Sequence, residues 1–189
     1  MVTSPAENDL DALKRKPSDL LRYIAWSTET KAQYGSILNF ICQRRLHWHL
    51  PDDIATPTGN AATTAICSNP VPFADPEDYK ILRNDWPYGV APGISHLVVW
   101  LRTPLATRDG GYLTEESHAL VDAFIQRTFV APLEERNRAA SPAGAGDPKK
   151  QVLWFKNWGA LQSIRSLEHV HVLVRDVPED ILKEWMGET

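Results

Sequence analysis

Two histidines near the carboxyl end of the chain have the type and spacing needed for chemistry at phosphorus. One residue separates His169 from His171 within an apolar, β-branched run. In a strand, this spacing places both rings on one face, about 6.6 Å apart along the chain. Because a neutral imidazole is a competent nucleophile toward phosphorus, the pair predicts His-based catalysis. The alternative is a pair of structural histidines.

A polar segment before the histidines could hold the anionic group. Gly159 would let the backbone approach a ligand closely. The other predicted binding residues of the segment carry side-chain hydrogen-bond donors: Asn157, Gln162, Ser163, Arg165 and Ser166. Lys156, Arg165 or Arg102 could neutralise charge that develops in the transition state.

A second histidine cluster invites a metal interpretation, which its spacing does not support. His47 and His49 lie close to Asp52 and Asp53, and both residue types are common ligands. Pro51 stands where a metal-binding HxHxDH pattern would have Asp. We therefore interpret the cluster as solvated residues at a helix end, and expect no metal and no other cofactor.

The remaining histidines and the familiar short motifs add little. His96 begins an apolar run and is expected to be a structural hydrogen-bonding residue, while His118 is expected to be exposed on a helix. The sequence has no GxSxG elbow, no P-loop and no GxGxxG, which excludes the common nucleotide-binding folds built on those loops.

Composition indicates one ordinary globular domain. The chain has 189 residues, of which 43% are hydrophobic and 23% charged, and a net charge of −4. That charge gives no support for nucleic-acid binding, and no apolar run approaches a membrane span. With only Cys42 and Cys67, and no apolar leader in Met1–Leu10, we expect a cytoplasmic protein.

Periodicity predicts helices first and a sheet later. Residues 1–54 read as an N-terminal helical extension and 55–189 as the core, with mobile loops near 55–76 and 139–150. The predicted helices are Asp9–Lys16, Asp19–Trp26 after a Ser18 cap, Thr28–Leu46, Thr114–Val130 and Glu179–Met186. The predicted strands are Ile94–Leu101, Val152–Phe155 and His169–Val174. This order indicates an α+β fold with an antiparallel sheet.

Several of these segments resemble the histidine triad (HIT) superfamily in the correct order. Asn157-x-Gly159, Ser166 and His169-φ-His171-φ match its signature, where φ is apolar. Asn84 to Tyr88 and then His96-Leu-Val-Val resemble its hairpin. The resemblance implies a HIT-like antiparallel sheet with a crossover helix, a His171 nucleophile supported by His169, and a ligand site that includes Asn84 and His96.

The pattern departs from that superfamily in two places. The loop from Asn157 to His169 is one residue longer, and Leu173 replaces the third histidine. Leucine has neither a proton nor a hydrogen bond to offer, which puts assistance to the leaving group in doubt.

Over most of its length the chain also resembles the fungal N-acetylglucosamine-induced proteins, a domain family of unknown function. The segments that carry this are Arg44–Trp48, Leu82–Gly89, His96–Trp100, Trp154–Trp158 and Glu168–Val172. The leading hypothesis is a hydrolase or transferase acting on a nucleotide, nucleotide-sugar or phosphosugar. The alternatives are a non-catalytic protein that binds such ligands, or a scaffold recruited to unrelated His-based acid–base chemistry. The resemblance to the largely dimeric HIT superfamily implies a homodimer.

Overall fold

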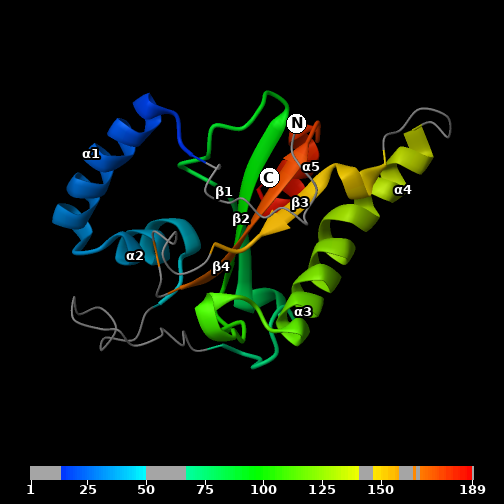
Figure 1. Cartoon of the computed structure of the whole chain (residues 1–189), viewed down its shortest axis with the longest axis horizontal. Helices are drawn as coiled ribbons and strands as arrows, with labels where there is room; N and C mark the ends of the chain where they lie inside the picture. Colours follow the sequence, from blue (N-terminus) through cyan, green and yellow to red (C-terminus); the bar gives the residue numbers. More distant parts are fainter. Residues whose placement is uncertain (1–13, 50–66, 141–146, 158–163, 165–166, 189) are drawn as a thin grey trace.

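A four-stranded antiparallel sheet divides the molecule, with helices on both sides (Figure 1). The computed structural model describes residues 14–49, 67–140, 147–157, 164 and 167–188. β1 (Tyr79–Arg83) pairs with β2 (Ile94–Leu101), β2 with β4 (Glu168–Arg175), and β4 with β3 (Val152–Phe155). The order β1-β2-β4-β3 confirms the α+β prediction with an antiparallel sheet.

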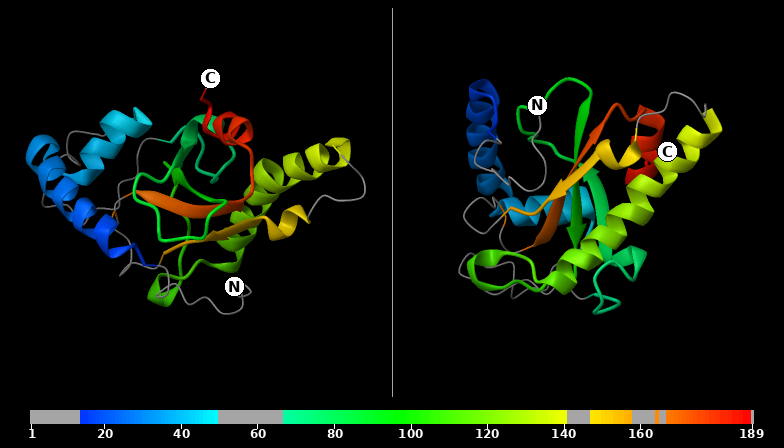
Figure 2. Two further views of the ribbon diagram at one scale, coloured as in Figure 1. Left: turned by 90° about the horizontal axis from the view of Figure 1, so that it is seen from above. Right: turned by 45° about the vertical axis from the view of Figure 1, so that its right-hand side comes forward.

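One face of the sheet packs against the long helical segment that joins β2 to β3 (Figure 2). This segment comprises α3 (Glu115–Ile125), the π-helical turn η5 (Gln126–Val130) and α4 (Ala131–Ala140). The C-terminal helix α5 (Glu179–Met186) joins the same core. The buried members of this core include Leu97, Val99, Leu101, Val121, Phe124, Phe129, Val170, Val172 and Val174. Because strand residues alternate between faces, this core fixes which residues point the other way.

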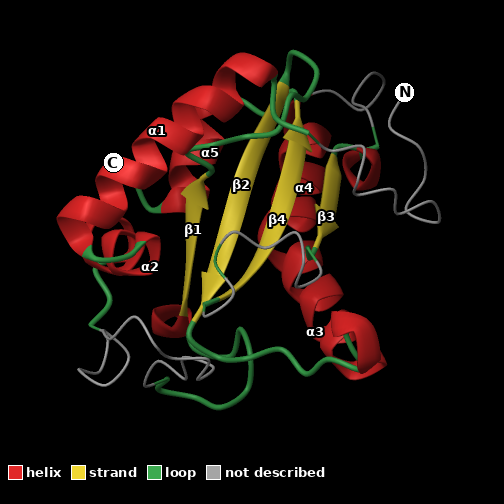
Figure 3. Ribbon diagram, turned by 60° about the vertical axis from the view of Figure 1, so that its left-hand side comes forward, coloured by secondary structure: helices red, strands yellow, loops and turns green. Residues whose placement is uncertain are grey.

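The opposite face is covered by the N-terminal helices, seen beside β1 in Figure 3. These are α1 (Pro17–Tyr34), α2 (Ile37–Phe40) and the π-helical η2 (Ile41–Leu46). Their apolar side chains and those of the sheet form a second core: Ile37, Cys42, Leu46, Trp48, Leu82, Val98 and Trp100. The register pairs Val98 with His171 and Trp100 with His169, so both histidines share this face.

The N-terminal helix boundaries differ from the prediction. α1 runs unbroken from Pro17 to Tyr34, so the predicted break near residue 27 is wrong. The chain turns instead at Gly35, whose φ of 77° suits glycine, and Ser36 caps α2 through its side chain. Ser18 is no cap, because Pro17 already occupies the first helical turn. The hydrophobic side chains Leu20, Leu21 and Ile24 are 43%, 70% and 53% exposed.

Two further helix boundaries differ from the prediction. The crossover helix was expected to end at Val130 but continues to Ala140, and the π-helical turn precedes Pro132, whose missing N–H interrupts regular helix bonding. Lys14–Lys16 is not helical, and the rest of the helix predicted at Asp9–Lys16 lies outside the described residues. So do the proposed domain boundary at 54/55, residues 55–66 of the first predicted loop and residues 141–146 of the second. The predicted strands omitted β1.

Candidate functional site

A row of hydrogen-bonded side chains crosses the sheet beneath the N-terminal helices. Nε2 of His96 lies 3.0 Å from Nδ1 of His171 on the neighbouring strand. Nε2 of His171 lies 3.1 Å from Nδ2 of Asn157, which follows β3. The Asn157 amide also donates to the Tyr88 hydroxyl at 3.0 Å. The row therefore connects three strands and the loop between β1 and β2.

This row fixes the proton positions of its central ring. With the Asn157 amide nitrogen facing it, Nε2 of His171 accepts a hydrogen bond and carries a lone pair. Nδ1 of His171 then carries the proton and donates to Nε2 of His96. His171 is therefore a neutral base whose Nε2 lone pair is held by a side-chain amide.

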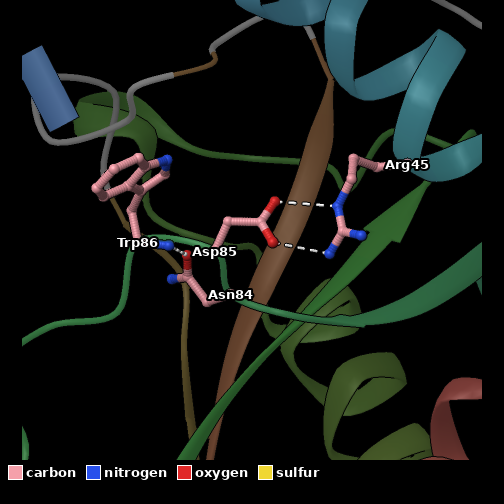
Figure 4. Close-up of polar contacts among 4 residues, drawn as sticks. All are labelled: Arg45, Asn84, Asp85 and Trp86. Carbon is pink, nitrogen blue, oxygen red and sulfur yellow. Dashed lines mark hydrogen bonds and ion pairs between the residues drawn. The ribbon is translucent and has the colours of Figure 1, made fainter. Parts of the chain in front are cut away.

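Asn84 holds the other end of the row. Its Oδ1 accepts the backbone N–H of Trp86 at 2.9 Å, as Figure 4 shows. Its Nδ2 therefore faces His96, lying 3.3 Å from Nδ1 and 3.2 Å from Nε2 of that ring. In the same loop, Asp85 accepts two hydrogen bonds from Arg45, at 3.0 and 2.8 Å, which join the loop to η2 (Figure 4).

His169 lies beside the row with a different tautomer constraint. Its Nδ1–H donates to the backbone oxygen of Leu167 at 2.9 Å, which leaves Nε2 unprotonated. In the part of the chain that the structure describes, no hydrogen bond reaches this Nε2 atom. The centroid of the His169 ring lies 4.7 Å from that of the Trp100 ring. It lies 5.3 Å from the centroid of the His171 ring, to which it is edge-on.

Burial keeps all three rings uncharged near neutral pH. The pKa of His96 is lowered to about 4, mainly by burial and to a smaller extent by the positive charge of Arg15. Burial also lowers the pKa of His169, partly opposed by its bond to Leu167. For His171, burial and then the neighbouring rings and Arg15 hold the pKa well below its usual range. Neutral imidazoles can act as bases or nucleophiles without first losing a proton.

The rings border a pocket between the sheet and the N-terminal helices. It encloses about 740 Å³, counting the space at its open mouth. His169, His171 and Asn157 line it, as the strand alternation predicts. Apolar and aromatic side chains from the helices and the sheet form most of the remaining wall, among them Tyr23, Trp26, Ile37, Ile41, Val98 and Trp100. A mostly apolar pocket with a few convergent polar groups is typical of small-molecule sites.

Most of the cations near this pocket are paired with carboxylates. Arg83, which lines it, contacts Glu179 at 2.6 Å. Lys156, which the sequence offered as a cation to neutralise phosphate charge, forms a partly buried ion pair with Glu168 at 2.8 Å. Arg15 also lines the pocket and was missed from sequence. The only signal was its place in the basic run directly before Pro17.

The structure brings together part of the predicted site. Asn84, His96, Asn157, His169 and His171 gather on one sheet face, and all except His96 line the pocket directly. Arg102 does not line it; its guanidinium lies 4.9 Å from the Trp48 ring centre. The predicted binding residues Gly159, Gln162, Ser163, Arg165 and Ser166 lie outside the described residues.

Leu173 continues the histidine face as an apolar residue. It pairs with His96 in the β2–β4 register and is 6% exposed. It packs with Phe155, and the partly buried Tyr88 and Val90 lie against this cluster. Leu173 therefore extends the histidine face with an apolar side chain packed in a hydrophobic cluster.

The other histidines contribute nothing to this pocket. His47 and His49 are exposed, and His118 is an exposed partner of Asp122 at 2.8 Å. Among the described residues, no group of three or more His, Cys, Asp or Glu is arranged to hold a metal ion. No helix in the described ranges combines the length and apolar character of a membrane span.

A family model described as "Protein of unknown function (DUF3605)" matches residues 2–175. The chain belongs to this family. The DUF3605 chain is 26% identical over 186 residues to "N-acetylglucosamine-induced protein 1" of Candida albicans, covering 95% of this chain and 68% of that protein. It is 28% identical over 146 residues to "Uncharacterized protein YPL067C" of Saccharomyces cerevisiae, covering 76% and 62%. The predicted relation to N-acetylglucosamine-induced proteins is confirmed.

A solved structure described as "Crystal Structure of HTC1" shares this fold. The TM-score is 0.63 at 25% identity, over 96% of this chain and 86% of the other. The DUF3605 chain therefore has a solved relative that covers both the sheet and the N-terminal helices. None of these descriptions states a reaction, so function has to be argued from the pocket.

Proposed function

We propose that this chain is a HIT-like hydrolase or transferase that acts on a nucleotide, nucleotide-sugar or phosphosugar through a histidine nucleophile. The observation that carries the proposal is the neutral His171, held by His96 and Asn157 at the wall of a small-molecule pocket. The antiparallel sheet and the helical crossover between β2 and β3 agree with the HIT resemblance. So does the place of His96 on the strand beside His171.

His171 is the proposed nucleophile because its Nε2 lone pair faces Asn157 in the pocket wall. An arriving phosphoryl oxygen would accept the Asn157 amide hydrogen bond in place of Nε2 and so release the lone pair. Nε2 then bonds to phosphorus while the bond from phosphorus to the leaving oxygen breaks, its electron pair staying on that oxygen. His96 accepts the Nδ1–H bond and stabilises the positive charge that develops on the ring.

The second half-reaction removes the phosphoryl group from His171. Water, or an acceptor hydroxyl in a transferase, attacks phosphorus and gives its proton to solvent, while the N–P bond electrons return to Nε2 and regenerate the neutral ring. Since Leu173 supplies no proton, the first leaving group departs as an anion. This favours leaving groups that are stable as anions, such as a phosphate or phosphate ester, over amines or alkoxides.

A non-catalytic binding protein is the second candidate, and two observations favour it. Both ring nitrogens of His171 are engaged by neighbours, and Leu173 removes the third polar group of the triad. Under this reading the pocket retains the ligand without breaking a bond, and Asn157 serves recognition alone.

Substitution of His171 distinguishes the two candidates. If the chain is an enzyme, His171→Ala abolishes turnover of the active compound in a panel of nucleoside polyphosphates, nucleotide-sugars and hexosamine phosphates. The affinity of His171→Ala for this compound stays within about tenfold, or 1.4 kcal/mol, of the wild-type affinity. The matched control is His118→Ala, which removes an exposed histidine from α3 and should leave turnover unchanged. Binding without turnover in the wild type, lost on Asn157→Ala, would replace the enzyme with the binding protein.

A further inference from the structure

Among the described arginines that line the histidine pocket, Arg15 has no carboxylate partner. Arg45 contributes two hydrogen bonds to Asp85, and Arg83 is paired with Glu179. Arg15 has no ion pair among the described residues, where its polar contact is one bond from Nε to the backbone oxygen of Trp86 at 3.2 Å. The pocket therefore carries an excess positive charge at this residue.

The guanidinium is held in place before any ligand arrives. Its carbon lies 4.4 Å from the ring centre of Tyr23 and 5.8 Å from that of Tyr88. The backbone beside it is also fixed, because the Gly89 N–H donates to the oxygen of Lys14 at 3.0 Å. An arginine fixed by its Nε and by a stacked ring leaves both terminal nitrogens available, which suits bidentate binding of an oxyanion.

A second donor in the same pocket is unused. Nε1 of Trp86 is buried and makes no hydrogen bond in the described part of the chain. Trp86 lines the pocket together with Arg15, and its backbone oxygen is the group that holds the guanidinium. Buried donors are normally satisfied, so an unpaired indole N–H in a pocket wall points to an acceptor on the ligand.

We propose that Arg15 binds the anionic group of the pocket's ligand, a phosphate-type oxyanion, with the Trp86 indole N–H as an additional donor. The inference rests on the proposed function, and it adds the segment before α1 to the site. The N-terminal helices then do more than cover the sheet, because they place the group that recognises the ligand's charge. This role lies outside the residues of the HIT-like motif.

A purely structural role for Arg15 makes a different prediction. As a clamp, Arg15 would join the N-terminal segment to the β1–β2 loop, and its loss would lower stability without selecting against anions. As an oxyanion-binding residue, it should affect the affinity for phosphate more than the thermal midpoint of unfolding. Its charge also reaches the rings, because Arg15 contributes to the low pKa values of His96 and His171.

The test is calorimetric titration of the full chain with inorganic phosphate and with the active compound of the panel. Arg15→Gln should weaken binding of both by about tenfold or more, the size expected for a charged hydrogen-bonding group. Arg15→Lys should fall between, since it keeps the charge but loses the planar fork. Trp86→Phe should weaken binding by less, since it removes only the indole donor. Lys31→Gln, the same charge change at an exposed position of α1, is the control and should bind like the wild type.

A second readout does not need a ligand. By NMR titration, Arg15→Gln should raise the pKa of His96 and His171, since it removes a cation that disfavours their protonation. If the wild type binds and folded Arg15→Gln binds equally well, the role of Arg15 is refuted and the proposed function stands. If the wild type binds neither phosphate nor any compound of the panel, the proposed function fails as well.

Discussion

Acid should destabilise this protein below pH 6.5, because three buried histidines are neutral in the folded state. In the unfolded chain these rings take up protons near their ordinary pKa of 6.5, whereas the folded chain resists protonation. Lower pH therefore favours the unfolded state, and the stability present above pH 6.5 is lost as the pH falls toward the folded pKa values.

The size of the loss can be worked out for His96. With a pKa of 6.5 unfolded and about 4 folded, this ring alone costs about 2 kcal/mol when the pH falls from 7 to 5. His169 and His171 add to the loss in the same direction. Glu116 and Asp180 have lowered pKa values and titrate below this window, so they do not obscure it.

Urea unfolding at pH 7, 6 and 5, followed by tryptophan fluorescence, measures the effect. Between pH 7 and 5 both proteins, the wild type and His96→Gln, should lose unfolding free energy. The loss in His96→Gln should be smaller than the loss in the wild type by about 2 kcal/mol. His118→Gln, at an exposed histidine, should retain the full wild-type loss. Equal wild-type stability at pH 7 and 5, or the same loss in His96→Gln, would refute the assignment of neutral buried rings.

The remaining predictions concern stability and substrate choice. Lys156→Met should cost about 1–3 kcal/mol in urea unfolding because it leaves a partly buried carboxylate without its cation, whereas Arg83→Met, which breaks an exposed pair, should cost under about 1 kcal/mol. Similar losses for both would contradict the burial of the first pair. Gly93→Ala should lower the thermal midpoint more than Gly187→Ala: both positions have positive φ, but at Gly93 a Cβ would also collide with Asp176. In steady-state assays, phosphoanhydrides should react faster than phosphoramidates of the same nucleoside, and a preference for the amidates would show that a proton donor assists departure.

The elements of the core could be predicted because local signals there agree with the tertiary packing. Ile94–Leu101, Val152–Phe155 and Glu179–Met186 were assigned at the bounds that the structure shows. Thr114, the first residue of the predicted helix, caps α3, and its side chain accepts from the backbone N–H of Ser117. In these segments the apolar period and the capping residues point to the same answer.

The N-terminal helices were less predictable because their boundaries depend on one backbone conformation. The helix α1 continues through Thr28, where a new helix was predicted, and the chain turns at Gly35. The positive φ of Gly35 cannot be predicted from the spacing of apolar residues. Leu21 and Ile24 of α1 are exposed, and the helix lines the pocket with Tyr23 and Trp26. Which face of an isolated helix is buried depends on what it packs against, and that partner is far away in the sequence.

The histidine pair could be placed from sequence, but its surroundings could not. Strand alternation put His169 and His171 on one face, and motif order put His96 beside them. Arg15 is more than 150 residues from His169 in sequence and joins the site only through helix packing. The ion pair between Lys156 and Glu168 could not be predicted, because the two residues meet only once β3 and β4 are paired in the fold.

A covalent intermediate on His171 is the most direct test of the proposed chemistry. Wild-type protein mixed rapidly with the active compound should show, by intact mass at neutral pH, a gain equal to the transferred group. The gain should disappear after brief acid treatment, as expected for a phosphoramidate, and should be absent from folded His171→Ala. Turnover that persists in His171→Ala, or an adduct mapped to another residue, would contradict His171 as the nucleophile.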